Sequence, residues 1–119
     1  GSASIEKAQG SMQVRGRDMV TGLPRVVEVP AKEIAVAMSE IIHQILDAVK
    51  DVLEQTPPEI SADVIDHGIV LTGGGAMLRH LAEMISKETQ VPAFVANDPL
   101  DCVALGTGAI LANPSLMKK

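Results

Sequence analysis

Three consecutive glycines, Gly73, Gly74 and Gly75, are the residues of this chain best suited to meet a ligand through the main chain. They follow the apolar run GIVLT (68–72) and precede a predicted helix that begins near Ala76. Glycine in regular structure is about 0.5–1 kcal/mol less favourable than alanine, so three in a row suggest that another group approaches the backbone closely. At the carboxyl end of a strand in an open α/β sheet, bare N–H groups and a helix dipole favour phosphates and nucleotides.

The glycine run matches neither of the common phosphate-binding signatures. It lacks the G-x-G-x-x-G spacing, and no Lys-Ser/Thr pair follows it as in a P-loop. The spacing alone therefore leaves two interpretations open, which are contact with a ligand and a tight turn under closely packed neighbours.

The other chemically capable residues favour structural roles. GTG (106–108) lies inside the last predicted helix, where close packing on a sheet explains glycine better than phosphate contact does. Cys102 has no companion base and is predicted to be a small core residue, and His43 falls on the polar side of a helix. Helix capping explains the carboxylates near element ends, which are Asp63, Asp66, Asp98 and Asp101. No catalytic triad or paired-acid arrangement is recognisable.

Composition argues against several classes of protein. The 119 residues carry a net charge of −5 and no Trp or Tyr, whereas nucleic-acid-binding proteins need clustered Lys and Arg. A single cysteine excludes an internal disulfide and, with three scattered histidines, gives no metal-ligand spacing. No stretch approaches the roughly 18 apolar residues of a membrane span, and no signal peptide opens the chain. We therefore expect a cytosolic protein.

The first part of the chain predicts a flexible lead-in and a β-hairpin. Residues 1–11 are small and polar and predict a mobile segment, in which the first two residues carry no structural weight. Apolar and polar residues alternate over 12–18 and again over 25–29, the period of half-exposed strands. A solvated strand face explains three arginines better than an anionic partner does: Arg15, Arg17 and Arg25.

Helices and strands are predicted for the rest of the chain. Apolar residues recur at steps of three and four over 31–55, which predicts one long amphipathic helix with a weakly marked start. TPPE (56–59) then predicts a capping box with Thr56 as the N-cap of a short helix.

The C-terminal half alternates strand and helix. A strand over 68–72, covered on both faces, is followed by a helix over 76–88 and a strand over 93–96. In the last predicted helix Asp98 is the cap and Pro99 the first residue, and five apolar residues face inward: Leu100, Val103, Ala104, Ile110 and Leu111. This alternation predicts an α/β layer with parallel pairing.

Three stretches together resemble the C-terminal part of MreB-type bacterial actin homologues, the MreB, Mbl and MreBH group of filament proteins that govern rod shape. They are VRGRDMVTGLPRVVEV, VLEQTPPEISADVIDHGIVLTGGGAMLRHLAEMI and VPAFVANDPLDCVALGTGAIL. The resemblance implies a partial actin-like, ribonuclease H-like α/β domain, mainly subdomain IIA, with an N-terminal β-hairpin. Residues 12–113 would form the C-terminal part of domain II, and residues 114–119 a tail.

The same resemblance assigns a role to the glycines. In actin-like proteins two α/β domains clasp ATP and magnesium, and a glycine turn of the second domain lies against the nucleotide. The positions that match this turn are Gly73, Gly74, Gly75 and Ala76. The intact parent is thus expected to form ATP-dependent filaments that control rod cell shape and cell-wall synthesis, and this chain would supply one wall of the nucleotide cleft.

Features that the resemblance leads one to expect are also missing. The phosphate-binding hairpins of the family, with their D-x-G signatures, are not present, and DMVTG (18–22) is only a superficial echo of them. The groups that organise magnesium and the attacking water are missing as well. This chain is therefore expected not to hydrolyse ATP alone and to hold nucleotide too weakly to retain it.

The partners implied by the resemblance are other copies of the parent, in a filament, and a RodZ-type membrane-anchored adaptor that docks on subdomain IIA. Exposed strand edges further predict that the isolated chain forms dimers or exchanges elements. Direct membrane attachment in the family is assigned to other segments, and no basic amphipathic helix is present here. The expected location is the cytoplasm, at the inner face of the cell membrane through the parent filament.

Two alternatives stay open beside this hypothesis. A sugar kinase or another actin-fold phosphotransferase would share the glycine turn, but TPPE and DPL-CVA-GTG do not support it. A stand-alone module that binds a protein through the long helix would need no nucleotide.

Overall fold

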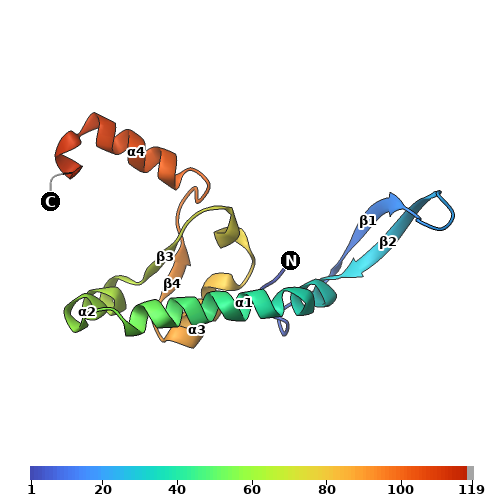
Figure 1. Ribbon diagram of the computed structural model, residues 1–119, viewed down its shortest axis with the longest axis horizontal. Helices are drawn as coiled ribbons and strands as arrows, with labels where there is room; N and C mark the ends of the chain where they lie inside the picture. Colours follow the sequence, from blue (N-terminus) through green and yellow to red (C-terminus); the bar gives the residue numbers. More distant parts are fainter. Residues whose placement is uncertain (118–119) are drawn as a thin grey trace.

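The computed structural model describes residues 1–117 as a β-hairpin joined to a body of helices and two short strands (Figure 1). The elements, in which η denotes a 3-10 helix, are β1 (Ser11–Arg17), β2 (Pro24–Pro30), α1 (Ala31–Glu54), α2 (Pro58–His67), β3 (Ile69–Leu71), η1 (Gly74–Met77), α3 (Leu81–Thr89), β4 (Ala93–Val95), α4 (Cys102–Ala112) and η2 (Pro114–Met117). The predicted mixture of helices and strands and the N-terminal hairpin are confirmed.

The hairpin of β1 and β2 projects from the start of α1, away from the rest of the chain (Figure 1). The two strands are antiparallel, with a register that runs from Ser11 opposite Pro30 to Arg17 opposite Pro24. Arg17 Nε donates to the Gly22 carbonyl at 2.9 Å, inside the connecting loop. Every residue of β1 is exposed, because no third strand or helix within residues 1–117 covers either face of the hairpin.

Helix α1 follows the predicted amphipathic pattern. Its buried residues include Ala35, Ile42 and Leu46, which lie on one face at helical spacing and pack toward α3. The helix starts after Pro30 without a side-chain cap, as the weak N-terminal signal predicted. His43 is exposed, as its place on the polar side predicted; it lies at the edge of a cavity between α1 and α3, and its Nδ1 is 2.7 Å from the Ser39 carbonyl.

The capping box predicted for the second helix is wrong. Pro57 is the N-cap residue of α2 and makes no side-chain cap hydrogen bond. The hydroxyl of Thr56 instead donates backward to the Val52 carbonyl at 2.6 Å, closing the end of α1. A threonine hydroxyl near a helix terminus has both carbonyl and N–H groups within reach, and here the carbonyl of the preceding helix is bonded.

Strands β3 and β4 pair in parallel, as predicted, with Ile69 opposite Ala93 and Leu71 opposite Val95. Ile69 and Leu71 pack against a core cluster formed by Ala3, Ile42, Leu46, Leu81 and Ile85. The expectation that this strand is covered on both faces is wrong for this chain, because Val70, which points to the other face, is 53% exposed. A two-stranded sheet that meets helices on one side leaves its second face open.

The helix predicted over 76–88 is divided. The chain first forms η1 and then turns, and α3 begins only at Leu81. His80, with φ of 66°, lies in the left-handed region, where a right-handed helix cannot continue. Gln90, with φ of 59°, ends α3 in the same way.

The expectations for the last helix are corrected. Asp98, with φ of 49°, belongs to a turn in which its carbonyl accepts from the Asp101 N–H, and α4 begins only at Cys102 with Asp101 as its N-cap residue. The residues expected to face inward are exposed, as Val103 at 76% and Leu111 at 82% illustrate, and α4 has no buried residue. A Cβ on either glycine of the GTG sequence would meet no atom of the described residues within 4 Å, so the predicted close packing on the sheet is not formed. The two-stranded sheet is too narrow to cover this helix.

The first residues of the chain are part of the core, contrary to the expectation that they carry no structural weight. Ser2 is fully buried and Ala3 is 3% exposed. Ser2 forms a parallel bridge with Arg79, and the Ala3 N–H donates to the Arg79 carbonyl at 2.8 Å. The Ser2 hydroxyl lies 2.8 Å from Nδ1 of His80, which links the segment to the start of α3.

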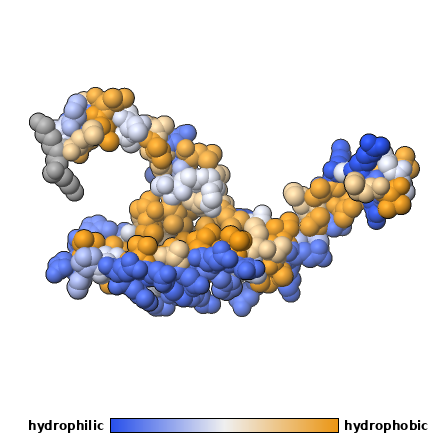
Figure 2. Space-filling model, viewed as in Figure 1, coloured by the Kyte–Doolittle hydropathy of each residue, from blue (hydrophilic) through white to orange (hydrophobic). Residues whose placement is uncertain are grey.

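The overall shape is extended and leaves much surface uncovered. The radius of gyration is 19.3 Å, against about 13.5 Å for a compact domain of this length. The accessible surface of 9025 Å² exceeds by about 2,800 Å² the roughly 6,200 Å² of a compact protein of equal mass. Hydrophobic residues gather along α4 and on the side of α1 that faces β3 and β4, while the outer side of α1 is hydrophilic (Figure 2).

Candidate functional site

The glycine run forms a strand–turn–helix junction. Gly73 follows β3 with φ of 82° and ψ of 172°, a conformation that essentially only glycine adopts. Its N–H donates to the Pro99 carbonyl at 2.7 Å. Gly74 then starts η1, in which the Ala76 N–H donates to the Gly73 carbonyl at 3.2 Å. The turn that the sequence predicts is thus present, and its first glycine is required by the backbone.

The next two glycines offer free main-chain donors. The N–H groups of Gly74 and Gly75 form no hydrogen bond with any residue between 1 and 117, as is usual for the first N–H groups of a helix. Both residues are exposed, and a Cβ on Gly75 would meet no atom within 4 Å. Two adjacent donors on exposed residues are chemically suited to an anionic oxygen.

The fourth predicted site residue, Ala76, lies in different surroundings. It is 6% exposed, so its side chain is part of the interior. Its N–H is already bonded to Gly73. The structure therefore brings the four predicted residues together but divides them, with Gly73 and Ala76 fixing the turn and Gly74 and Gly75 presenting free donors.

An apolar groove adjoins the turn. It has a volume of about 900 Å³ and lies between α1 and the segment from Leu71 to Leu81, with Gly74 and Gly75 at its edge. Met38, Ile41 and other aliphatic residues of α1 form one side of it. The site thus combines main-chain hydrogen-bond donors with an aliphatic wall, and the described residues place no carboxylate in that wall.

The turn over 97–101 also belongs to this site, and it was missed by the sequence analysis. The pattern assigned Pro99 to the start of a helix, whereas its carbonyl holds Gly73 and the neighbouring Leu100 lies beside Gly74. A signal was available in the sequence. The sequence Asn97-Asp98-Pro99, which begins two residues after the strand that pairs with β3, is typical of a turn at the same edge of the sheet as the glycines.

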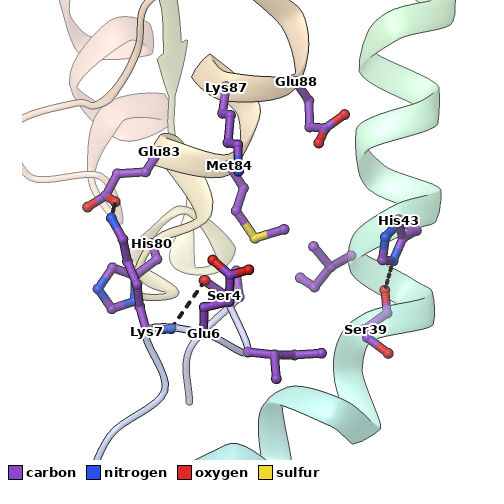
Figure 3. Close-up of a pocket in the computed structure, with 13 residues that line it drawn as sticks. Ser4, Glu6, Lys7, Ser39, His43, His80, Glu83, Met84, Lys87 and Glu88 are labelled. Atoms are coloured by element: carbon purple, nitrogen blue, oxygen red, sulfur yellow. Dashed lines mark hydrogen bonds and ion pairs between the residues drawn. The ribbon is translucent and has the colours of Figure 1, made fainter.

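A second cavity, of about 430 Å³, lies between the N-terminal segment, α1 and α3 (Figure 3). Lys7 is paired with Glu83, and Glu88 is paired with Lys50 at 2.8 Å. The hydrogen bond from each lysine holds the pKa of its carboxyl partner below the usual value, and the bond to Glu88 raises the pKa of Lys50. Such carboxylates stay ionised near neutral pH, so they are paired charges and not general acids.

The DMVTG loop (residues 18–22) is held in shape by hydrogen bonds within the hairpin. Oδ1 of Asp18 accepts from the N–H groups of Thr21 at 3.0 Å and Val20 at 2.8 Å, and Oδ2 lies 3.1 Å from Arg25. The two N–H bonds, followed by the Arg25 contact, hold the pKa of Asp18 below its ordinary value. The aspartate thus closes the hairpin loop.

We expect acid to loosen this loop. Because the pKa of Asp18 is lowered in the folded hairpin, its stabilising contribution is fully present above the ordinary value of 3.8 and is lost as pH falls through the lower folded pKa. The amide chemical shifts of Val20 and Thr21, followed by NMR from about pH 6 to about pH 2, should titrate together. Asp18→Asn should remove this titration, and constant amide shifts in the unaltered chain would contradict the prediction.

The last of the candidate residues, Cys102, lies at the start of α4. Cys102 is half-buried, with its Sγ 3.5 Å from the Asp98 carbonyl. Among residues 1–117 no group of three or more His, Cys, Asp or Glu side chains is arranged to hold a metal ion. No helix in the same range has the length and apolar character needed to cross a membrane.

Comparison with known proteins gives one family. The family model described as "MreB/Mbl protein" matches residues 1–119. The chain is 50% identical over 108 residues to the cell shape-determining protein Mbl of Bacillus subtilis, covering 91% of this chain and 32% of Mbl. It is 44% identical over 111 residues to the cell shape-determining protein MreB of Escherichia coli, covering 93% of this chain and 32% of MreB.

Solved structures agree with these matches. The crystal structure of MreB5 of Spiroplasma citri bound to ADP superposes with a TM-score of 0.84 at 35% identity, covering 96% of this chain and 35% of MreB5. The same protein bound to AMPPNP gives a TM-score of 0.83, also at 35% identity, covering 97% of this chain and 34% of that one. The expected partial actin-like fold is confirmed, and the chain spans about a third of the length of its relatives. Since the family model matches from the first residue to the last, the chain belongs to the MreB/Mbl family.

Proposed function

We propose that this chain is the C-terminal part of an MreB-like filament protein that determines cell shape. Residues 12–113 form the C-terminal part of actin-like domain II, mainly subdomain IIA, and residues 114–119 are a tail. The curated relatives are cell shape-determining proteins of about three times this length, which supports the proposal. The parent forms ATP-dependent filaments at the inner face of the cell membrane and thereby controls cell-wall synthesis.

Within that parent, the glycine turn supplies one wall of the nucleotide cleft. The observation that carries this proposal is the pair of free N–H groups on Gly74 and Gly75 at the end of β3. Two structures of MreB5 contain ADP and AMPPNP, which makes a nucleotide the best-supported ligand. The donor set suits phosphate or ribose oxygens, so the turn binds through the main chain.

The chemistry of ATP hydrolysis requires the rest of the parent. Bound ATP with magnesium would supply the reacting phosphate, and the residues of this chain would position the nucleotide from one side. Magnesium is held by residues of the parent outside this region. The isolated chain therefore has no ATPase activity and binds nucleotide only weakly, because one wall of a cleft does not orient the ligand.

NMR titration tests the nucleotide proposal. The isotope-labelled chain, titrated with MgATP to about 1 mM and above, should show amide shift changes concentrated at Gly74 and Gly75, in the weak-affinity range. The parent protein should show the same changes at much lower concentration. A folded chain and a folded parent that both lack any change at residues 73–76 would favour the interaction module that needs no nucleotide.

The uncovered surface supports self-association and a larger parent. The excess of about 2,800 Å² over a compact protein falls within the range of obligate interfaces, which is roughly 2,000–5,000 Å². In the parent, the remaining chain covers the apolar faces of α4 and β3, and subdomain IIA contributes filament contacts and docks a RodZ-type adaptor. The isolated chain is expected to dimerise or exchange elements through the same faces.

The family membership favours this proposal over a sugar kinase. The curated relatives are named for cell shape. A phosphotransfer assay on the parent with and without a sugar acceptor separates the two, since only a kinase transfers phosphate to the sugar.

A further inference from the structure

We infer that the turn over residues 97–101 is a positioning element for the glycine turn, and that Leu100 is its principal positioning side chain. The inference rests on the proposed nucleotide site and adds to it residues that do not themselves present donors to the ligand. It is carried by contacts between two turns that are about 25 residues apart in the sequence but adjacent in the fold.

The two turns are joined by hydrogen bonds that continue beyond the paired strands. The Ala96 N–H donates to the Leu71 carbonyl at 2.9 Å, directly after β4. The Gly73 N–H then donates to the Pro99 carbonyl at 2.7 Å. The second bond occupies the donor of the first glycine and holds that residue in a conformation that only glycine tolerates. The chain is thereby bent so that η1 starts at Gly74.

The turn that provides this carbonyl is itself well fixed. Asp98 has φ of 49°, a value that aspartate tolerates better than most residues, and its carbonyl accepts from the Asp101 N–H at 2.9 Å. Sγ of Cys102 lies 3.5 Å from the same carbonyl. The ring of Pro99 restricts the φ of Pro99 itself, the residue that follows Asp98. Because these contacts hold the Pro99 carbonyl in place, its hydrogen bond fixes the position of the Gly73 N–H.

The side chain of Leu100 lies beside Gly74, one of the residues that carry a free N–H. A Cβ built on Gly74 would lie 3.3 Å from Cδ2 of Leu100, closer than ordinary van der Waals contact. Leu100 is 67% exposed, so it is not a core residue, and packing in the core does not explain why a leucine stands here. A leucine that lies against a glycine with an unpaired donor restricts the directions in which that backbone can move.

The first test measures the geometry without nucleotide. In Leu100→Ala, hydrogen exchange of the Gly73 amide should be about tenfold faster, as for a hydrogen bond that has lost the support of its neighbours. Exchange of the α1 amides should stay unchanged. Leu23→Ala removes an equally exposed leucine from the hairpin loop and should leave the Gly73 amide unaffected. Unchanged exchange at Gly73 in Leu100→Ala would overturn the inference.

The second test measures the consequence in the parent protein with MgATP as the probe. Leu100→Ala should weaken binding about fivefold to tenfold, and Leu100→Met, which keeps an apolar side chain of similar length, should restore most of the affinity. Gly74→Ala should weaken binding less in the Leu100→Ala background than alone, because its added methyl group then has no leucine to displace. Equal effects in both backgrounds would overturn the role of Leu100. A parent that binds no MgATP would refute the proposed function, and the exchange experiment would still decide the positioning inference.

Discussion

Replacing Gly68 by alanine is expected to destabilise the chain by about 3–5 kcal/mol, the sum of backbone strain and steric overlap. Gly68 has φ of 83° and ψ of −179°, a region that alanine rarely adopts. An added Cβ would lie 2.7 Å from the Pro92 carbonyl oxygen, a backbone atom, and 3.2 Å from a ring carbon of Phe94. The same carbonyl accepts from the Ile69 N–H at 2.7 Å, so the overlap falls on the first hydrogen bond between β3 and β4.

Urea unfolding followed by circular dichroism measures this effect, and Gly10 provides the matched control. Gly10 has φ of 85°, but no atom lies within 4 Å of its Cβ position. Gly10→Ala should therefore destabilise the chain by only about 1 kcal/mol, the strain of the backbone alone. Equal losses for the two variants would contradict the steric argument, and a Gly68→Ala chain as stable as the original would refute it.

Replacing Gly75 by valine is expected to weaken MgATP binding by the parent protein about 10- to 100-fold while leaving its fold intact. The φ of Gly75 is not positive and its Cβ position is free of neighbours, so the side chain fits the unliganded structure. Bound nucleotide would meet the valine at the two free donors, and each lost hydrogen bond to a charged group weakens binding by about 1.5–3 kcal/mol.

Isothermal titration calorimetry on the parent measures this change, with Gly16→Val as its control. Gly16 also has no neighbour within 4 Å of its Cβ position and lies in β1, where valine is a favourable residue. The control should bind MgATP like the unaltered protein. Should Gly75→Val bind equally well, the glycines would serve only to form a tight turn, and the proposed cleft wall would be refuted.

Local sequence patterns determined the elements whose structure depends on nearby residues. The period of apolar residues in α1 and the alternation in the hairpin predicted both elements, because an isolated helix or hairpin already separates its faces by residue type. The strand–glycine–helix order likewise predicted the junction at Gly73, and the resemblance of the motifs predicted the family. Capping was less predictable, since the hydroxyl of Thr56 had two partners within reach and bonded to Val52.

The tertiary structure decided which apolar faces are covered and which distant residues meet. The sequence of α4 marks it as apolar but does not say what lies against it, and no residue between 1 and 117 covers Val103 or Leu111. Burial of Ser2 and the bond from Gly73 to Pro99 arise only when distant segments are brought together by α3 and by the parallel pairing of β3 with β4. Periodicity records how a residue lies relative to its own helix or strand, whereas contacts between elements depend on the packing of the whole chain.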